Sequence, residues 1–129
     1  MVYERLYNEL QALVVDWDFS YLKFEAGEGF MPLVIEKLTE DDEQIVISMT
    51  HYFKQNGDLI PDPDMEIRVK VKDKVAEALS FRDQYSYRQV YHGKMINLQT
   101  KRELNWFLQC WLKNIKAQGY QLRVKEKES

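Results

Sequence analysis

The chain has 129 residues, which suffices for one domain and is too short for two domains of ordinary size. Apolar residues make up 45% of it and charged residues 30%, a composition typical of globular rather than disordered proteins. The net charge is −3, yet residues 1–66 hold 15 acidic and 4 basic side chains, whereas residues 67–129 hold 6 and 14. The composition excludes a collagenous protein, and the single cysteine, Cys110, excludes an intrachain disulfide.

The same counts predict a cytoplasmic protein. A lone cysteine favours a reducing compartment. Charged residues interrupt the first ten positions, so these lack the apolar stretch of a signal peptide. No segment approaches the roughly 20 apolar residues that span a bilayer, so no membrane contact is expected.

The first predicted element is a helix. Apolar residues recur at spacings of three and four from Tyr3 to Val14 and form one stripe, while polar residues fill the other faces. The helix is expected to end around residues 15–18, where β-branched residues meet an acidic turn.

Runs rich in aromatic and β-branched residues follow from Phe19 onward, separated by Gly, Pro, Asp and Asn. Residues 56–58 predict a turn, and Pro61 and Pro63 predict extended or turn geometry up to Asp64. The next run alternates apolar and charged residues, which is typical of a strand with one buried and one solvated face. The predicted strands are 19–26, 32–39, 44–54, 65–72, 76–82 and 86–92.

The last predicted helix covers about residues 101–118. Thr100 is expected to be its N-cap, with Glu103 completing a capping box, and Gly119 supplies a left-handed stop. Residues 120–124 alternate and could add a short edge strand, whereas residues 125–129 are expected to fray.

This order of elements predicts one α+β domain over residues 1–129. We expect an antiparallel meander sheet of about five or six strands, packed on N-terminal and C-terminal amphipathic helices.

Carboxylates gather beside the predicted turn at residues 56–58. Asp58, Asp62 and Asp64 could offer oxygen ligands to a divalent metal, together with His51 on the preceding strand. This set would suit a metal-dependent hydrolase. A solvated hairpin explains the same aspartates, and a histidine that closes an apolar strand face is more often a hydrogen-bonded core or rim residue. No cofactor motif occurs, so no cofactor is expected.

An aromatic and basic segment covers residues 81–92. Arg82 and Arg88 could contact phosphates, while Tyr85 and Tyr87 could stack on single-stranded bases. The same tyrosines are good strand formers, and the pI of about 5.4 is low for a dedicated nucleic-acid domain. A nucleic-acid-binding accessory protein is therefore an alternative interpretation.

Trp106 points away from the apolar stripe of the last predicted helix, in company with Lys113. Outward tryptophans are enriched at protein contacts, although a strand or the tail could also cover this one. Together with the uneven charge, Trp106 favours a non-enzymatic module that binds a protein partner or another copy of itself.

Residues 51–66 and 111–120 carry a resemblance to an uncharacterised bacterial family of small α+β domains of unknown function. The similar features are a tyrosine-rich strand, a Gln-Asn-Gly-Asp turn at residues 55–58 and an Asp-Pro-x-Met-Glu run at residues 62–66. The family has no assigned activity, so the resemblance implies only a bacterial cytosolic setting.

Overall fold

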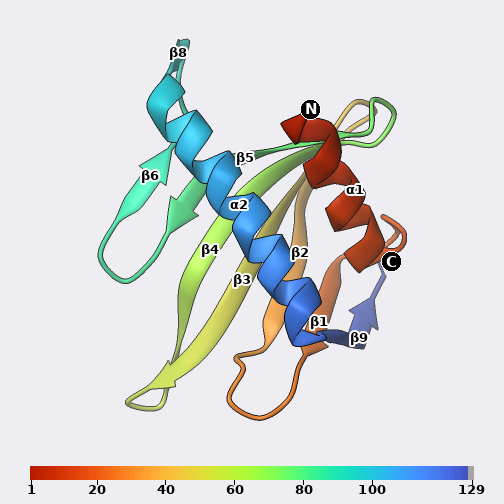
Figure 1. Ribbon diagram of the computed structural model, residues 1–129, viewed down its shortest axis with the longest axis vertical. Helices are drawn as coiled ribbons and strands as arrows, with labels where there is room; N and C mark the ends of the chain where they lie inside the picture. The colour runs from red at the N-terminus through yellow and green to blue at the C-terminus, as the bar shows by residue number, and fades with distance from the viewer. Residues whose placement is uncertain (128–129) are drawn as a thin grey trace.

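A computed structural model describes residues 1–127 (Figure 1). The elements follow one another as α1 (Val2–Val14), β1 (Tyr21–Glu25), β2 (Leu33–Glu40), β3 (Ile45–Gln55), β4 (Asp58–Lys70), β5 (Val75–Arg82), β6 (Tyr87–Gln89), β7 (Tyr91–His92), β8 (Met95–Ile96), α2 (Leu98–Gln118) and β9 (Gln121–Glu126).

Helix α1 has the predicted apolar stripe and ends where the sequence indicated. Leu6, Leu10 and Val14 are buried on one side of it. Val15 follows with a positive φ of 71°, a conformation that cannot continue a right-handed helix.

The main sheet has the order β6-β5-β4-β3-β2-β1-β9 and is antiparallel at every pairing that the structure describes. Strands β1 to β6 form a meander, and α2 then crosses the sheet and brings β9 to the opposite edge, beside β1 (Figure 1). The predicted α+β fold is confirmed. The described sheet has seven strands because the tail joins it, and β9 includes residues 125 and 126, which were expected to fray. Residues 128 and 129 lie outside the described residues.

The hairpin of β3 and β4 is longer than predicted. Asn56 and Gly57 have φ of 53° and 87°, which fits a tight two-residue turn, and pairing resumes at Asp58 rather than at residue 65. The register then shifts between Thr50 and Tyr52, and the bulge includes Pro63 on β4. A proline fits there because its missing N–H interrupts no regular ladder bond.

The predicted strand 86–92 is divided at Val90. Its N–H donates to the carbonyl of Leu79 on β5, and its side chain is buried. Beyond it, β7 pairs with β8 in a separate two-stranded ribbon that precedes α2.

Helix α2 begins three residues earlier than predicted. Asn97 is its N-cap, and its side-chain oxygen accepts a hydrogen bond from the Thr100 N–H at 3.0 Å. Glu103 forms no capping box, since it accepts hydrogen bonds from Gln99 and Arg88. Gly119 ends the helix in the left-handed conformation as predicted, with φ of 74°.

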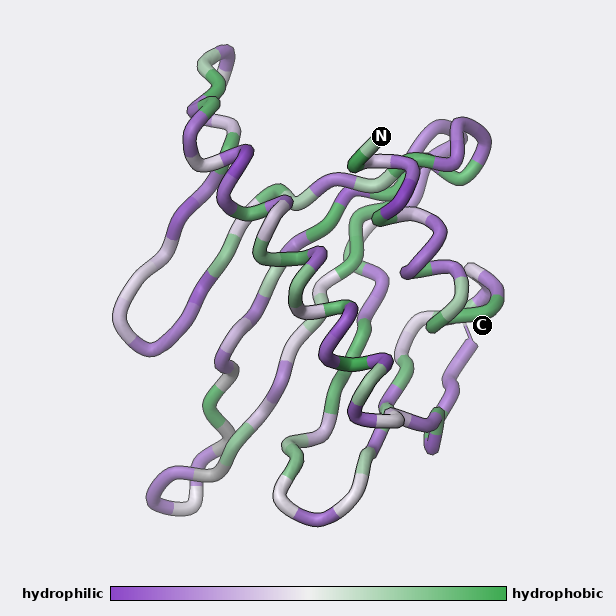
Figure 2. Tube along the Cα trace, in the orientation of Figure 1, coloured by the Kyte–Doolittle hydropathy of each residue, from purple (hydrophilic) through white to green (hydrophobic). Residues whose placement is uncertain are grey.

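The core lies between the two helices and the face of the sheet that they both cover (Figures 1 and 2). Alternation along each strand sends apolar side chains to this face and mostly polar ones to the other, which carries no helix. The buried set is Leu6, Leu10, Val14, Leu22, Phe24, Leu33, Ile35, Ile45, Ile47, Met49, Met65, Ile67, Val69, Ala76, Ala78, Leu104, Leu108, Trp111, Leu112 and Ile115, with others around it.

Candidate functional site

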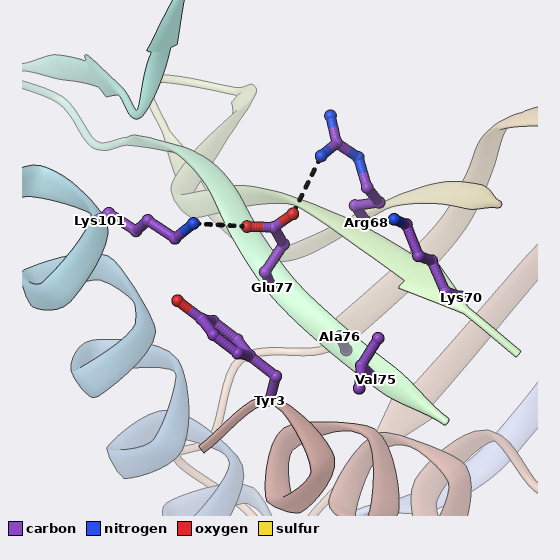
Figure 3. A pocket seen from close by; sticks show the side chains of 7 residues that line it. All are labelled: Tyr3, Arg68, Lys70, Val75, Ala76, Glu77 and Lys101. Atoms are coloured by element: carbon purple, nitrogen blue, oxygen red, sulfur yellow. Dashed lines mark hydrogen bonds and ion pairs between the residues drawn. The ribbon is translucent and has the colours of Figure 1, made fainter. Parts of the chain in front are cut away.

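Charged and aromatic side chains converge where the first turns of both helices meet β4 and β5 (Figure 3). Glu77 on β5 accepts a hydrogen bond from Arg68 Nη1 at 2.9 Å and one from the Tyr91 hydroxyl at 2.8 Å. The oxygen that accepts from Tyr91, Glu77 Oε2, also lies 3.6 Å from Lys101 Nζ on α2. That ammonium lies 5.5 Å from the ring centroids of both Tyr3 and Tyr91. Antiparallel register places Arg68 opposite Glu77, the two helices add Tyr3 and Lys101, and β7 adds Tyr91.

A pocket of about 170 Å³ opens beside this network, and we call it the Glu77 pocket. Burial lowers the pKa of Lys101, but its hydrogen bond with Tyr91 and the charge of Glu77 raise that pKa by more, so the ammonium stays charged. The pocket is lined by Tyr3, Arg68, Lys70, Val75, Ala76, Glu77 and Lys101.

His51 is a hydrogen-bonded core residue. Trp111 Nε1 donates to His51 Nε2 at 3.0 Å, and His51 Nδ1 lies 3.2 Å from the carbonyl oxygen of Pro32. Because Nε2 accepts, the ring proton must be on Nδ1, and the imidazole is neutral. Burial lowers the pKa of His51, and the carbonyls of Pro32 and Met31 offset part of that effect. Both ring nitrogens are therefore engaged within the fold.

The structure does not assemble the metal ligands that the sequence suggested. His51 is on the core side of β3, whereas Asp64 accepts a hydrogen bond from Thr50 on the face without helices. Asp58 is exposed where β4 begins, and Asp62 lies near the bulge. Within residues 1–127, no group of three or more His, Cys, Asp or Glu side chains is arranged to hold a metal ion.

The aromatic and basic segment divides into two parts. Tyr85 is 90% exposed in the loop between β5 and β6, and the guanidinium of Arg82 lies 4.9 Å from the ring centroid of Tyr87. Arg88 instead pairs with Glu103 on α2. Of the four residues named for nucleic-acid binding, Arg82, Tyr85 and Tyr87 are thus presented together at the tip of the hairpin of β5 and β6, and Arg88 is not.

Trp106 lies on the solvent side of α2, as the sequence predicted, and is 67% exposed. Arg102 and Lys113 are also exposed, one turn before it and two turns after it, and in the described chain neither makes an ion pair. Strand β9 pairs with β1 and leaves Trp106 uncovered. We call Arg102, Trp106 and Lys113 the α2 outer face.

The face of the sheet without helices has a groove of about 260 Å³, which we call the sheet groove. The Thr50 hydroxyl donates to Asp64 at 3.0 Å, and the Ser80 hydroxyl donates to Glu66 at 3.1 Å. Burial raises the pKa of the neighbouring Tyr52, and the carboxylates of Glu36 and Asp64 raise it further. The groove is lined by Leu38, Ser48, Asp64, Glu66, Ser80, Arg82 and Tyr87.

Comparison with known proteins identifies the family and no activity. A family model described as a domain of unknown function, DUF6908, matches residues 2–121. The chain belongs to the DUF6908 family. The match covers every residue of the Glu77 pocket, the α2 outer face and the sheet groove in this DUF6908 domain. No curated protein and no solved structure matches the chain.

Sequence reasoning missed both hollows of the DUF6908 domain. Alternation already placed Glu66 and Arg68 on a solvated face, but only the strand order shows that Ser80 and Arg82 lie beside them. Tyr3 and Lys101 come from different helices, and no local pattern links them. Neither helix of the described chain has both the length and the apolarity to cross a bilayer.

Proposed function

We propose that this DUF6908 domain is a non-catalytic interaction module that associates with further copies of itself, head to tail. In this arrangement the α2 outer face of one copy occupies the sheet groove of the next. The observation that carries the proposal is the exposure of Trp106, 67%, at the centre of a helix face. Burying a large aromatic ring in a contact is favourable by roughly 25 cal/mol per Å² of apolar surface, and tryptophan is enriched among residues that dominate binding energy.

Charge complementarity supports a second copy as the occupant. The α2 outer face presents Arg102 and Lys113 around Trp106, and the sheet groove presents Asp64 and Glu66 beside the single cation Arg82, so that its lining carries a net charge of −1. Opposite charges at the two surfaces would steer the encounter and select the register. Leu38, 47% exposed at the groove, offers an apolar contact for the indole.

The placement of the two surfaces also supports head-to-tail association. The helices lie on one face of the sheet and the groove on the other (Figure 1), so one copy can use both surfaces at once. Such a heterologous contact forms chains or rings rather than an isolated two-fold dimer.

Sedimentation over a range of protein concentrations tests the proposal. At low salt we expect the average mass to rise with concentration, and to fall again at high salt because screening weakens the charged contact. Trp106→Ala and Asp64→Arg should each give a monomer, since each removes one of the two surfaces. The control Tyr85→Ala removes an exposed aromatic outside both surfaces and should change nothing.

Mixing the two deficient variants gives a sharper result. The Trp106→Ala copy retains its groove and the Asp64→Arg copy retains its α2 outer face, so the mixture should form a 1:1 dimer that grows no further. A wild-type chain that stays monomeric at every concentration in low salt would contradict the proposal, as would a mixture without dimer.

We further propose that the module works in the bacterial cytoplasm. The single cysteine supports a reducing compartment, and the family resemblance of residues 51–66 supports a bacterial source.

Nucleic-acid binding is a second candidate function, favoured by the hairpin tip of Arg82, Tyr85 and Tyr87. Tyr85 is 90% exposed and free to stack on a base, with the Arg82 guanidinium close by. Fluorescence anisotropy with a labelled single-stranded oligonucleotide should show binding that weakens steeply with salt and is reduced in Tyr85→Ala. Absence of binding at low ionic strength would eliminate this candidate.

A further inference from the structure

We propose that the Glu77 pocket is a binding site for a small phosphate monoester. The inference is independent of self-association, because the pocket shares no residue with the α2 outer face or the sheet groove. It rests on the charge of the pocket, on an unused donor of the lining residue Arg68 and on the size and lining of the pocket.

The charge of the pocket matches that of a phosphate monoester. Arg68, Lys70 and Lys101 bring three positive charges, and Glu77 contributes one negative charge. Arg68 and Lys101 hold Glu77 between them, at 2.9 Å and 3.6 Å. The net charge of the lining is therefore +2, and a phosphate monoester carries about −1.5 to −2 at neutral pH.

Arg68 has hydrogen-bonding capacity that the fold does not use. Its Nη1 donates to Glu77, and its guanidinium lies over the ring of Tyr91 at 5.3 Å. Its Nε, in contrast, is buried and has no hydrogen-bond partner within the described residues. A buried donor without a partner is unfavourable, so a turn of the Arg68 side chain that brings Nε into the pocket and against an oxyanion would gain a charge-assisted hydrogen bond.

Lys70 is the group most free to meet a ligand. It is the last residue of β4, is partly buried at the pocket, and makes no ion pair with any described residue. In Figure 3 it lies on the same side of Glu77 as Arg68, whereas Lys101 and Tyr3 lie on the other.

The remaining lining sets the size of the ligand. Val75, Ala76 and the ring of Tyr3 give the pocket an apolar wall beside its cations. Its volume of about 170 Å³ is below the roughly 300–1,000 Å³ usual for pockets that enclose drug-sized ligands. A phosphate on a compact apolar or aromatic body fits this description better than a whole nucleotide.

Calorimetric titration with phenyl phosphate, inorganic phosphate and benzoate tests the proposal. It is best done on the Trp106→Ala variant at low salt, so that self-association cannot contribute. We expect saturable binding of phenyl phosphate, weaker binding of inorganic phosphate because it has no apolar body, and weaker binding of benzoate because it carries one charge. Benzoate binding as tightly as phenyl phosphate would overturn the assignment to phosphate.

Two substitutions with opposite expected effects locate the site. Lys70→Gln removes a cation and should weaken phenyl phosphate binding about tenfold, which corresponds to a single charge-assisted contact. Glu77→Gln removes the only carboxylate of the lining and should tighten binding several-fold, a gain that a purely structural role for Glu77 would not produce.

The matched control is Lys72→Gln, which removes an exposed lysine two residues beyond Lys70 and outside the pocket lining. It should leave the affinity unchanged. No heat with phenyl phosphate, or an equal loss of affinity in Lys70→Gln and Lys72→Gln, would overturn the proposal.

Discussion

His51 is held neutral by its position between α2 and the beginning of β2. Only 8% of the residue is exposed, and Trp111 donates to the nitrogen that protonation would need. Protonation would therefore break the bond with Trp111 and place a charge in a largely apolar site. Tyr120 adds a ring contact at 5.7 Å, so three aromatic side chains close this end of the core.

The lowered pKa of His51 predicts a pH-dependent stability. As the pH falls, the unfolded chain binds the proton first, so the stabilisation is complete above about pH 6.5 and declines below it. The loss from one proton cannot exceed about 1.4 kcal/mol per pH unit. The difference in unfolding free energy between about pH 7.5 and about pH 5.5, obtained from urea unfolding, measures this loss.

Two histidine variants decide whether His51 causes the loss of stability at low pH. His51→Gln should show a smaller difference in unfolding free energy between the two pH values, because its side chain does not titrate. His92→Gln replaces an exposed histidine and should keep the wild-type difference. An unchanged difference in His51→Gln would contradict the assignment.

At the scale of elements, α2 protects an edge of the sheet. Strand β6 pairs with residues 80–82 only, so the earlier part of β5 has a free edge. Asn105 of α2 accepts a hydrogen bond from the Ala78 N–H at 2.8 Å and donates one to the carbonyl of Lys101 at 2.8 Å. A single buried amide thus joins the helix to the strand and covers backbone that would otherwise be unpaired.

Asn105→Ala should destabilise the domain by about 1–3 kcal/mol, the usual cost of a buried donor left without a partner. The Ala78 N–H would also exchange faster with solvent, which amide hydrogen exchange measures residue by residue. Asn114→Ala is the matched control, because Asn114 is an exposed residue of the same helix. Equal effects of the two substitutions would show that Asn105 stabilises only the helix.

The helices and the central strands could be predicted because each satisfies a local rule. The stripe of α1, the stop at Gly119 and the alternation from residue 65 to residue 70 appear in the structure, whereas the strand predicted to reach residue 72 ends at Lys70. The predicted start of α2 was wrong because Asn97 and Thr100 both have side chains that can cap a helix. In the structure Asn97 is the cap, and Thr100 is a buried residue of the first turn. The predicted start of β4 was wrong because a bulge accommodates Pro63, and pairing continues beyond it from Pro61 to Asp58.

At the scale of the whole molecule, the acidic and basic halves of the sequence are not separate in space. Strand β9 from the basic half pairs with β1 from the acidic half. Lys125 contacts Asp16 at 2.9 Å, and Lys127 lies 3.6 Å from Asp18. The proposed self-association therefore depends on the few charges at the α2 outer face and in the sheet groove, and not on a separation of the two halves in space.

This arrangement predicts that salt acts on association and not on folding. Exposed ion pairs such as Lys125–Asp16 contribute little to stability, so the urea midpoint of the Trp106→Ala monomer should change little between about 50 mM and about 500 mM NaCl. The average mass of the wild type should fall over the same range. A urea midpoint that falls markedly over the same range of salt would mean that salt lowers the average mass by destabilising the fold.

The sequence by itself determined the fold class, the two amphipathic helices and the outward direction of Trp106 on the second of them, and it favoured a hydrogen-bonded core or rim role for His51, because periodicity and polarity along one segment suffice for each. The tertiary structure alone decided the place of β9, the sheet groove and the Glu77 pocket. Tyr3, Arg68, Glu77 and Lys101 belong to four different elements. Their meeting depends on strand order and on where each helix crosses the sheet, which are properties of long-range packing that no local pattern contains.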